Sequence, residues 1–233
     1  MVKQILTRFH FPFSKVQPTP LAMDHGLTAP PSDKAFESSG PYPELVGFCM
    51  VAKYVASTSG MGLVLGGKQP GTFTGYSNSS WADDTESLRS TQGYCFSLGT
   101  GAVSWRSTRA SSVSSSSYEA DVYAAAMAAK ELRWLSFLLT DLREWPRSPS
   151  VLFADNRPAI LLCEEPRLVG KAKHIQLRYF LLREFQQRGQ ARVVRVVSEA
   201  NTADIFTKAL PPWDHQRFCT QLGLVSTGPH LLA

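Results

Sequence analysis

Three aspartates occupy positions from which their carboxylates could converge on a metal ion. Asp155 directly follows a short apolar run typical of a buried strand, Asp121 lies in the first turn of a predicted helix, and Asp204 begins another. Strand ends and helix starts point side chains toward the rim of a sheet. Carboxylates bind hard cations such as Mg²⁺, and two ions about 3.5–4 Å apart can drive phosphodiester hydrolysis. Taken singly, each aspartate more commonly caps a helix or pairs with its dipole.

A basic segment lies in the last third of the chain. Residues 171–195 hold seven cations and one acid, so this window carries +6, and the rest of a chain with net charge +5 sums to −1. Such a concentration of positive charge is the footprint expected for a phosphate backbone, and the alternative is the solvated face of a surface helix. His174 fits a packed histidine equally well. The residues that we expect to contact nucleic acid are Lys171, Lys173, His174 and Arg178.

Hydrophobic periodicity predicts a mixed α/β fold around these residues. Strands are expected at 62–65, 72–77, 93–98, 102–106, 151–154 and 191–197, the third and fourth forming a hairpin. A long helix is expected over 118–139, capped by Ser116 with Glu119 and carrying one apolar stripe that includes Leu132. Shorter helices are expected at 52–55, 158–163, 175–188, 202–208 and 213–222. Strands in a meander followed by alternating helices and strands predict a mixed sheet with helices packed on it.

Composition excludes several classes of protein. The 233 residues are 43% hydrophobic, which excludes wholesale disorder, and no apolar run approaches the roughly 20 residues needed to cross a bilayer. The four cysteines form no C-x-x-C pair, which excludes a zinc ribbon, a thioredoxin-type motif and a disulfide-dense secreted scaffold. We therefore expect an intracellular protein that is not secreted, with reduced thiols, in a compartment that the sequence leaves open.

A series of short motifs follows in one order along the chain. They are GYSNSSWA (75–82), RSTQGY (89–94), VSW (103–105), EAD (119–121), AAKE (128–131), DN (155–156), KHI (173–175), RY (178–179) and TADIFTK (202–208). Over about residues 66–224 they resemble the ribonuclease H domain of copia-type LTR retrotransposon Pol polyproteins. The resemblance implies a ribonuclease H-like fold, a five-stranded mixed sheet flanked by helices. It also implies an endonuclease that hydrolyses the RNA strand of an RNA–DNA hybrid.

The N-terminal part resembles the same polyprotein further upstream. QILTRF (4–9) and PTPL (18–21) are similar to the end of the reverse transcriptase region, and YPELVG (42–47) to the connection after it. A helical stretch of the family is missing before the Ala-Lys pair at 52–53. We therefore expect residues 1–65 to be a truncated reverse transcriptase and connection remnant, largely irregular, with a ribonuclease H-like domain at 66–224 and a tail at 225–233. The basic start also suits a transit peptide, which the resemblance disfavours.

The resemblance assigns the candidate catalytic and metal-binding residues. The family uses Asp, Glu, Asp and Asp to hold two Mg²⁺ or Mn²⁺ ions, and the matching positions are Asn78, Asp121, Asp155 and Asp204. Asn78 lacks the charge of a carboxylate, and Asp121 is shorter than glutamate by one methylene, about 1.5 Å of reach. A misplacement of about 1 Å can cost 10²-fold in rate, so we expect impaired hydrolysis. Asp83 and Asp84 lie beyond the strand end and are not expected to replace Asn78.

Three functions remain open. The first is a Mg²⁺-dependent ribonuclease H within a retroelement polyprotein, with the reverse transcriptase domain as its partner. The second is a module that binds RNA–DNA hybrid or another nucleic acid without turnover, and the third is the remnant of a degraded element. The residues at 78 and 121 favour the second and third over efficient catalysis, and no membrane partner is expected.

Overall fold

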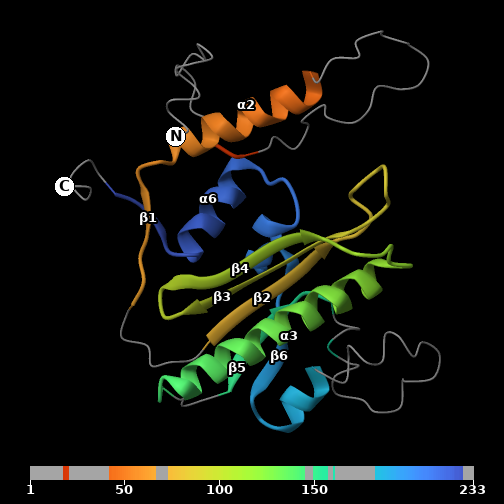
Figure 1. The fold of residues 1–233 in the computed structure, drawn as a ribbon, viewed down its shortest axis with the longest axis vertical. Helices are drawn as coiled ribbons and strands as arrows, with labels where there is room; N and C mark the ends of the chain where they lie inside the picture. The colour runs from red at the N-terminus through yellow and green to blue at the C-terminus, as the bar shows by residue number, and fades with distance from the viewer. Residues whose placement is uncertain are drawn as a thin grey trace. The chain divides into compact units, whose positions relative to one another are not determined.

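A five-stranded sheet dominates the fold of this chain (Figure 1). The computed structural model describes residues 18–20, 42–66, 73–144, 149–156, 160 and 182–227, and for 42–49 it describes the backbone alone. The strands lie in the order β4-β3-β2-β5-β6. Because the first three are antiparallel and the last two join in parallel, the sheet is mixed, and the predicted fold class is confirmed.

The antiparallel half of the sheet is a meander of three strands. They are β2 (Phe73–Ser80), β3 (Thr91–Leu98) and β4 (Gly101–Arg109). The predicted hairpin between β3 and β4 is present, and a register shift lies between Phe96 and Ser97. In the β2–β3 pair, Asn78 lies opposite Gly93. The meander therefore places the middle of the GYSNSSWA motif inside the sheet.

The parallel half extends the sheet from the other side of β2. It consists of β5 (Ser150–Ala154) and β6 (Ala191–Arg195), both shorter than the antiparallel strands. β5 pairs with β2 through Thr74, Gly75 and Tyr76, so Ala154 at the end of β5 lies one residue before the level of Asn78. Asp155 follows β5 directly and thus projects from the same end of the sheet that β2 reaches with Asn78.

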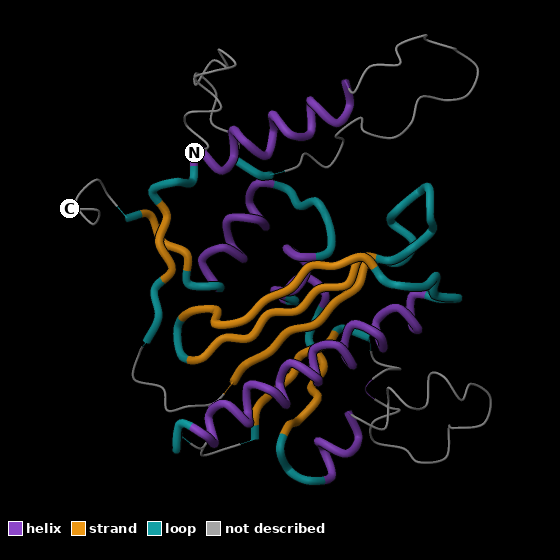
Figure 2. Tube along the Cα trace, viewed as in Figure 1, coloured by secondary structure: helices purple, strands orange, loops and turns teal. Residues whose placement is uncertain are grey.

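Helix α3 (Ser117–Asp141) packs along one face of the sheet (Figures 1 and 2). Its N-cap is Ser116, whose hydroxyl accepts the Glu119 N–H at 3.2 Å, as predicted. The Glu119 carboxylate accepts the N–H of Ser115 at 2.7 Å, one residue earlier than a standard capping box requires. The helix is three residues longer than predicted. The predicted apolar stripe is buried at every position, namely Val122, Ala125, Ala129, Leu132, Leu135 and Leu139.

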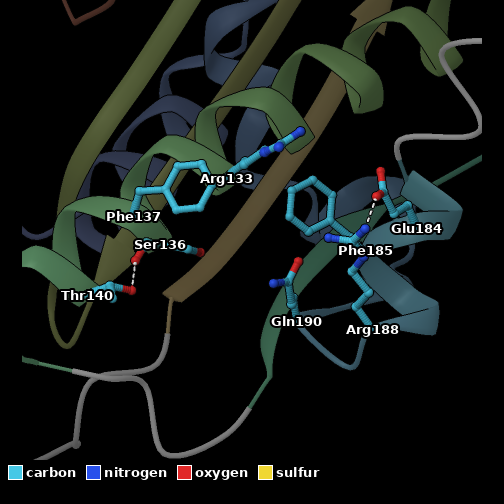
Figure 3. Close-up of a pocket in the computed structure, with 8 residues that line it drawn as sticks. All are labelled: Arg133, Ser136, Phe137, Thr140, Glu184, Phe185, Arg188 and Gln190. Atoms are coloured by element: carbon cyan, nitrogen blue, oxygen red, sulfur yellow. Dashed lines mark hydrogen bonds and ion pairs between the residues drawn. The ribbon is translucent and has the colours of Figure 1, made fainter.

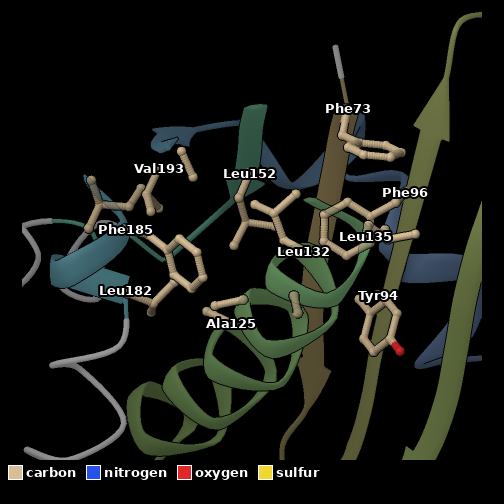
Figure 4. Packing of buried hydrophobic residues seen from close by; sticks show 14 of the residues in the cluster. Phe73, Tyr94, Phe96, Ala125, Leu132, Leu135, Leu152, Leu182, Phe185 and Val193 are labelled. Atoms are coloured by element: carbon tan, nitrogen blue, oxygen red, sulfur yellow. The ribbon is translucent and has the colours of Figure 1, made fainter. Parts of the chain in front are cut away.

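The core lies between α3 and the sheet. Its largest buried side chains come from β2, β3, α3 and β5, and Leu132 and Phe96 are at most 1% exposed. Leu182 and Phe185, on the helical residues 182–187, close the core beside α3 (Figure 4). Burial of these apolar side chains, worth about 1.5–3 kcal/mol each, is what holds the helix to the sheet.

Two short 3-10 helices follow β6. They are η2 (Ser198–Ala200) and η3 (Thr202–Phe206), the second of which lies within the helix predicted at 202–208. η3 contacts β2 and β3. The predicted helices at 158–163 and 175–188 fall mainly outside the described residues. Of the first helix the structure describes only Ile160, and of the second it describes residues 182–188, of which 182–187 are helical.

The chain divides into two compact units. The larger unit, Leu63–Lys208 with Thr220–Leu224, contains the whole five-stranded sheet, α3 and η3. The smaller unit is Met1–Gly62, Ala209–Cys219 and Val225–Ala233. The domain limits predicted near residues 65 and 224 stay a prediction.

The smaller unit contains α2 (Tyr42–Ser57) and most of α6 (Pro212–Gln221). The short helix predicted at 52–55 is thus part of a 16-residue helix. Tyr54 and His215 meet edge to face, with ring centroids 5.4 Å apart. Two short strands, β1 (Met61–Leu63) and β7 (Leu224–Ser226), pair separately. Within the part of the chain that the structure describes, no helix has the length and apolar character to span a bilayer.

Candidate functional site

The four predicted metal-site positions lie in the larger unit, and each comes from a different element. Asn78 is in β2, Asp121 is the fifth residue of α3, Asp155 follows β5, and Asp204 is the third residue of η3. Successive side chains of a strand point to opposite faces, so Asn78 and Ser79 face different neighbours. The site therefore has two halves, one on the η3 face of the sheet and one on the α3 face.

The η3 half joins Asn78 directly to Asp204. The Nδ2 atom of Asn78 donates to Oδ1 of Asp204 and, at 3.0 Å, to Oγ1 of Thr207. The other carboxylate oxygen of Asp204 lies 2.8 Å from Nζ of Lys208, one helical turn later. Asn78 and Asp204 are each only 5% exposed. Both oxygens of Asp204 are therefore already paired with donors, one of them a cation.

A second asparagine connects the same two elements in the opposite direction. Asn201, which is fully buried and caps η3, donates from Nδ2 to the backbone oxygen of Ser77 in β2 at 3.0 Å. Beside it, η3 lies so close to β3 that a Cβ at Gly93 would come within 2.7 Å of Cβ of Phe206. The separation of η3 from the sheet is thus set by close packing as well as by hydrogen bonds.

The α3 half surrounds Asp121. Its Oδ1 accepts from the hydroxyl of Ser79 at 2.5 Å, and its Oδ2 accepts from Nδ2 of Asn156 at 2.6 Å. Burial raises the pKa of Asp121 above the ordinary 3.8, and the nearby charge of Asp155 raises it further, while the two hydrogen bonds lower it. Burial is the largest of these effects. The carboxylate is thus fixed by neutral donors at a desolvated position.

Asp155 is the more open member of the set. Its Oδ2 accepts from the hydroxyl of Ser198 in η2 at 3.0 Å. Arg195, at the end of β6, lies level with Ala154 in the β5–β6 register and is exposed. The end of the sheet thus carries a half-buried carboxylate and an exposed guanidinium.

The residues at these positions do not fit a two-ion centre as they are arranged. Five of the six carboxylate oxygens of Asp121, Asp155 and Asp204 accept from a side-chain donor. A divalent cation needs these oxygens as ligands, and Asn78 turns a donor rather than an oxygen toward Asp204. Among the described residues, no group of three or more His, Cys, Asp or Glu side chains is placed to hold a metal ion.

The other acidic residues near the site have separate roles. Asp83 accepts from the N–H and hydroxyl of Thr91, both at 2.7 Å, and Asp84 pairs with Arg109 at 3.0 Å. Glu119 is turned back toward Ser115 at the start of α3. None of the three contacts the predicted site residues through these bonds, and the expectation that Asp83 and Asp84 do not replace Asn78 stays a prediction.

Sequence reasoning missed the donors that occupy the site. They are Ser79, Asn156, Ser198, Asn201, Thr207 and Lys208. Some signal was present, since Lys208 stands four residues after Asp204 and Asn156 directly follows Asp155. The predicted nucleic-acid contacts Lys171, Lys173, His174 and Arg178 lie outside the described residues and stay a prediction.

A separate pocket lies at the other end of α3. It has a volume of about 290 Å³ and lies between α3 and the helical residues 182–187 (Figure 3). Its lining includes Arg133, Phe137, Thr140, Phe185 and Arg188, but none of the predicted site residues. From Asp121 to Phe137 is about 24 Å along the helix. The pocket is therefore distinct from the carboxylate site.

Comparison with known proteins places the chain among retroelement sequences. It is 35% identical over 179 residues to the retrovirus-related Pol polyprotein from transposon RE2 of Arabidopsis thaliana, covering 77% of this chain and 12% of that protein. It is 32% identical over 161 residues to the corresponding polyprotein from transposon TNT 1-94 of Nicotiana tabacum, covering 69% of this chain and 12% of the relative. No protein-family model matches the chain.

Solved structures give a weaker likeness. The RNase H1 of the archaeon Halobacterium salinarum is 13% identical, and the match covers 59% of this chain and 95% of that one at a TM-score of 0.45. Because this score is low, the fold assignment rests on the order and direction of the strands. The chain, which spans 12% of the length of each of these two Pol polyproteins, is homologous to a segment of copia-type retrotransposon Pol polyproteins and carries a ribonuclease H-like fold.

Proposed function

We propose that this chain is a ribonuclease H-like domain that binds RNA–DNA hybrid and is impaired in hydrolysing the RNA strand. The observation that carries this proposal is the amide of Asn78, which donates to Asp204 at the position where the family's first metal ligand belongs. A carboxylate pair would attract divalent cations, whereas an amide hydrogen-bonded to a carboxylate that also contacts Lys208 does so far less. Loss of cleavage does not require loss of the fold, since the core lies away from these residues.

Binding of RNA–DNA hybrid is supported by basic side chains, which can contact phosphate without a metal ion. Arg195 is exposed beside the carboxylate end of the sheet, and it belongs to the +6 window at 171–195. Contacts from Arg and Lys to phosphate oxygens position a protein on a duplex without reading its sequence. We place Lys171, Lys173, His174 and Arg178 in the same role. In a polyprotein of this family, the linked reverse transcriptase domain would be the source of the hybrid.

A cleavage assay tests the catalytic part of this proposal. The purified chain is incubated with labelled RNA–DNA hybrid and Mg²⁺ or Mn²⁺, beside Asn78→Asp, Asp121→Glu and the double variant. We expect no or weak cleavage by the unaltered chain and the largest gain in the double variant. Efficient cleavage by the unaltered chain that Asp155→Asn abolishes would overturn impaired hydrolysis.

Binding is tested separately by fluorescence anisotropy of the hybrid without divalent cations. A protein that neutralises several phosphates loses affinity steeply as salt rises, with a slope of about −0.9 per phosphate on B-form duplex DNA. We expect such a slope, and a shallower one for Arg195→Ala combined with Lys173→Ala. A flat response to salt, or an unchanged affinity in the double variant, would contradict the proposed interface.

A domain with no residual hydrolysis is the second candidate. It is favoured by the pairing of both Asp204 oxygens and both Asp121 oxygens with donors. The same assay separates the two candidates, because only an impaired enzyme shows residual cleavage that depends on Asp155.

A further inference from the structure

We propose that Asn78 has converted a metal-ligand position into a latch that fastens η3 to β2 without any metal ion. The inference rests on the assignment of position 78 under the proposed function, but it concerns the stability of the domain rather than its chemistry. Three observations carry it: the use of both amide protons of Asn78, the burial of the contact, and the dependence of η3 on neighbouring elements for its place.

The contacts of Asn78 require an amide. An asparagine NH₂ group has two protons, and here one goes to Asp204 and the other to Thr207. An ionised aspartate in the same place has no proton to give, so its oxygens would face the Asp204 carboxylate at hydrogen-bond distance. Two carboxylates that close cannot both ionise without a counter-charge. Lys208 already contacts Asp204, and its side chain is 41% exposed, so it is a partly solvated counter-charge for one carboxylate.

The contact between Asn78 and Asp204 is buried, so water cannot replace a hydrogen bond that is lost there. Asn78 and Asp204 are both 5% exposed, and a buried charge that loses its partner destabilises a protein far more than an exposed one. In the present arrangement the carboxylate of Asp204 accepts a hydrogen bond from the amide of Asn78 and forms an ion pair with the ammonium group of Lys208. The unaltered site is therefore electrostatically complete without a divalent ion.

η3 needs such a fastening because it is only five residues long. A single 3-10 turn has too few internal hydrogen bonds to persist without tertiary contacts. The bonds from Asn78 to η3 and from Asn201 back to Ser77 cross between β2 and η3 in opposite directions. Together with the close approach over Gly93, they hold η3 against the sheet.

The inference makes a distinctive prediction about divalent cations. The unaltered chain should have the same melting temperature in EDTA and in millimolar Mg²⁺ or Mn²⁺. Asn78→Asp should melt about 4–8 °C lower in EDTA and recover much of that loss when Mn²⁺ is added, because a ligand that binds only the folded state stabilises it. Gln190→Glu is the control, because it adds the same charge at an exposed position. It should change neither the melting temperature in EDTA nor its response to Mn²⁺.

A charge swap keeps the test decisive. In Asn78→Asp combined with Asp204→Asn, the amide and the carboxylate exchange places, so one hydrogen bond between them can form again. We expect this double variant to melt higher than Asn78→Asp in EDTA and to lose the response to Mn²⁺. Asn78→Ala, which removes the latch without adding charge, should lower the melting temperature with no response to Mn²⁺.

Several outcomes would overturn the latch. An Asn78→Asp variant as stable as the unaltered chain in EDTA would contradict it. An unaltered chain that Mn²⁺ stabilises as much as it stabilises Asn78→Asp would contradict it too. If Asn78→Asp does not fold at all, a charge swap that also fails to fold, or that melts no higher than Asn78→Ala, contradicts it too. These melting experiments contain no nucleic acid, so the latch can fail while the cleavage and binding assays still support the proposed function, and the reverse also holds.

Discussion

The two ends of α3 use one helix in different ways. Near its N-terminus, Glu119 and Asp121 are held by short hydrogen bonds from Ser115, Ser79 and Asn156. Near its C-terminus the side chains around the pocket are aromatic and basic, and Phe137 is 56% exposed with the guanidinium of Arg133 5.5 Å from its ring centroid. One end is a closed polar network, and the other is an open surface that mixes aromatic, charged and polar side chains.

The difference shows where the stability of the domain originates. Between the two ends runs the buried stripe of α3, centred on Leu132, which packs against the sheet. The polar end fixes the positions of charged groups without contributing much apolar burial. The exposed side chains at the open end, such as Phe137, contribute little to the polar network or to apolar burial. We therefore expect substitutions in the middle of the helix to lower stability most. Substitutions at the polar end should change how stability depends on pH and metal ions, and substitutions at the open end should have little effect.

Leu132→Ala should have the largest effect. Leu132 is 1% exposed, and truncating a buried leucine typically costs about 2–5 kcal/mol through lost burial and the cavity left behind. Urea unfolding measures the loss. Trp134→Ala, at a neighbouring residue that is 56% exposed, is the control and should cost much less. Equal losses in the two variants would contradict the comparison.

Gly93→Ala should have the next largest effect, in the η3 half of the site. The added Cβ would lie 2.7 Å from Cβ of Phe206 and 2.8 Å from Cγ2 of Thr207, so η3 must move away from β3. Overpacking of this kind costs about 1–3 kcal/mol. Thermal unfolding checks it, with Gly60→Ala as the control because its nearest new contact would be 3.6 Å. An unchanged melting temperature for Gly93→Ala would show that η3 is not closely packed.

Asp121→Asn should have a smaller effect that depends on pH. Because the pKa of Asp121 is raised in the folded chain, mainly by burial, its ionisation opposes folding. The favourable contribution is fully present below the ordinary pKa of 3.8 and is lost as the pH rises through the raised value. Asparagine does not titrate, so the variant should gain melting temperature relative to the unaltered chain as the pH rises above about 4. A difference that is constant with pH would contradict the raised pKa.

Phe137→Ser should have the smallest effect. The ring is more than half exposed, and its contact with Arg133 is worth about 0.5–1 kcal/mol at such a position. We expect hybrid binding and cleavage to be unchanged, because the pocket is about 24 Å along the helix from Asp121. A loss of hybrid affinity in this variant would place nucleic acid on the open end and overturn the division between the two ends.

The elements were largely predictable because their patterns are local. The Ser116 cap and the 3.6-residue apolar period locate α3, since both depend on residues within a few turns. The β3–β4 hairpin follows from alternation around a glycine-containing loop. The helix predicted at 202–208 is the shorter 3-10 helix η3, which contacts both β2 and β3.

The contents of the site were less predictable because they depend on distant pairs. Motif matching named the position of Asn78, but the bond from its amide to Asp204 spans 126 residues of sequence. Likewise, Ser79 reaches Asp121 because a strand alternates its faces, and only the fold shows which neighbour each face meets. The role of these four positions in catalysis stays a prediction.

The hydrogen bonds that Asn78 and Asn201 make between β2 and η3 also bear on how such a site can change over time. If Asn78 stabilises the domain as proposed, a return to aspartate weakens the fold before any chemistry is regained, because Asp121 is still one methylene too short for the family's glutamate. Under this proposal, a change of Asn78 to aspartate passes through a less stable protein. The melting temperature of Asn78→Asp measures the height of that barrier, and no loss of stability there would mean that the change is freely reversible.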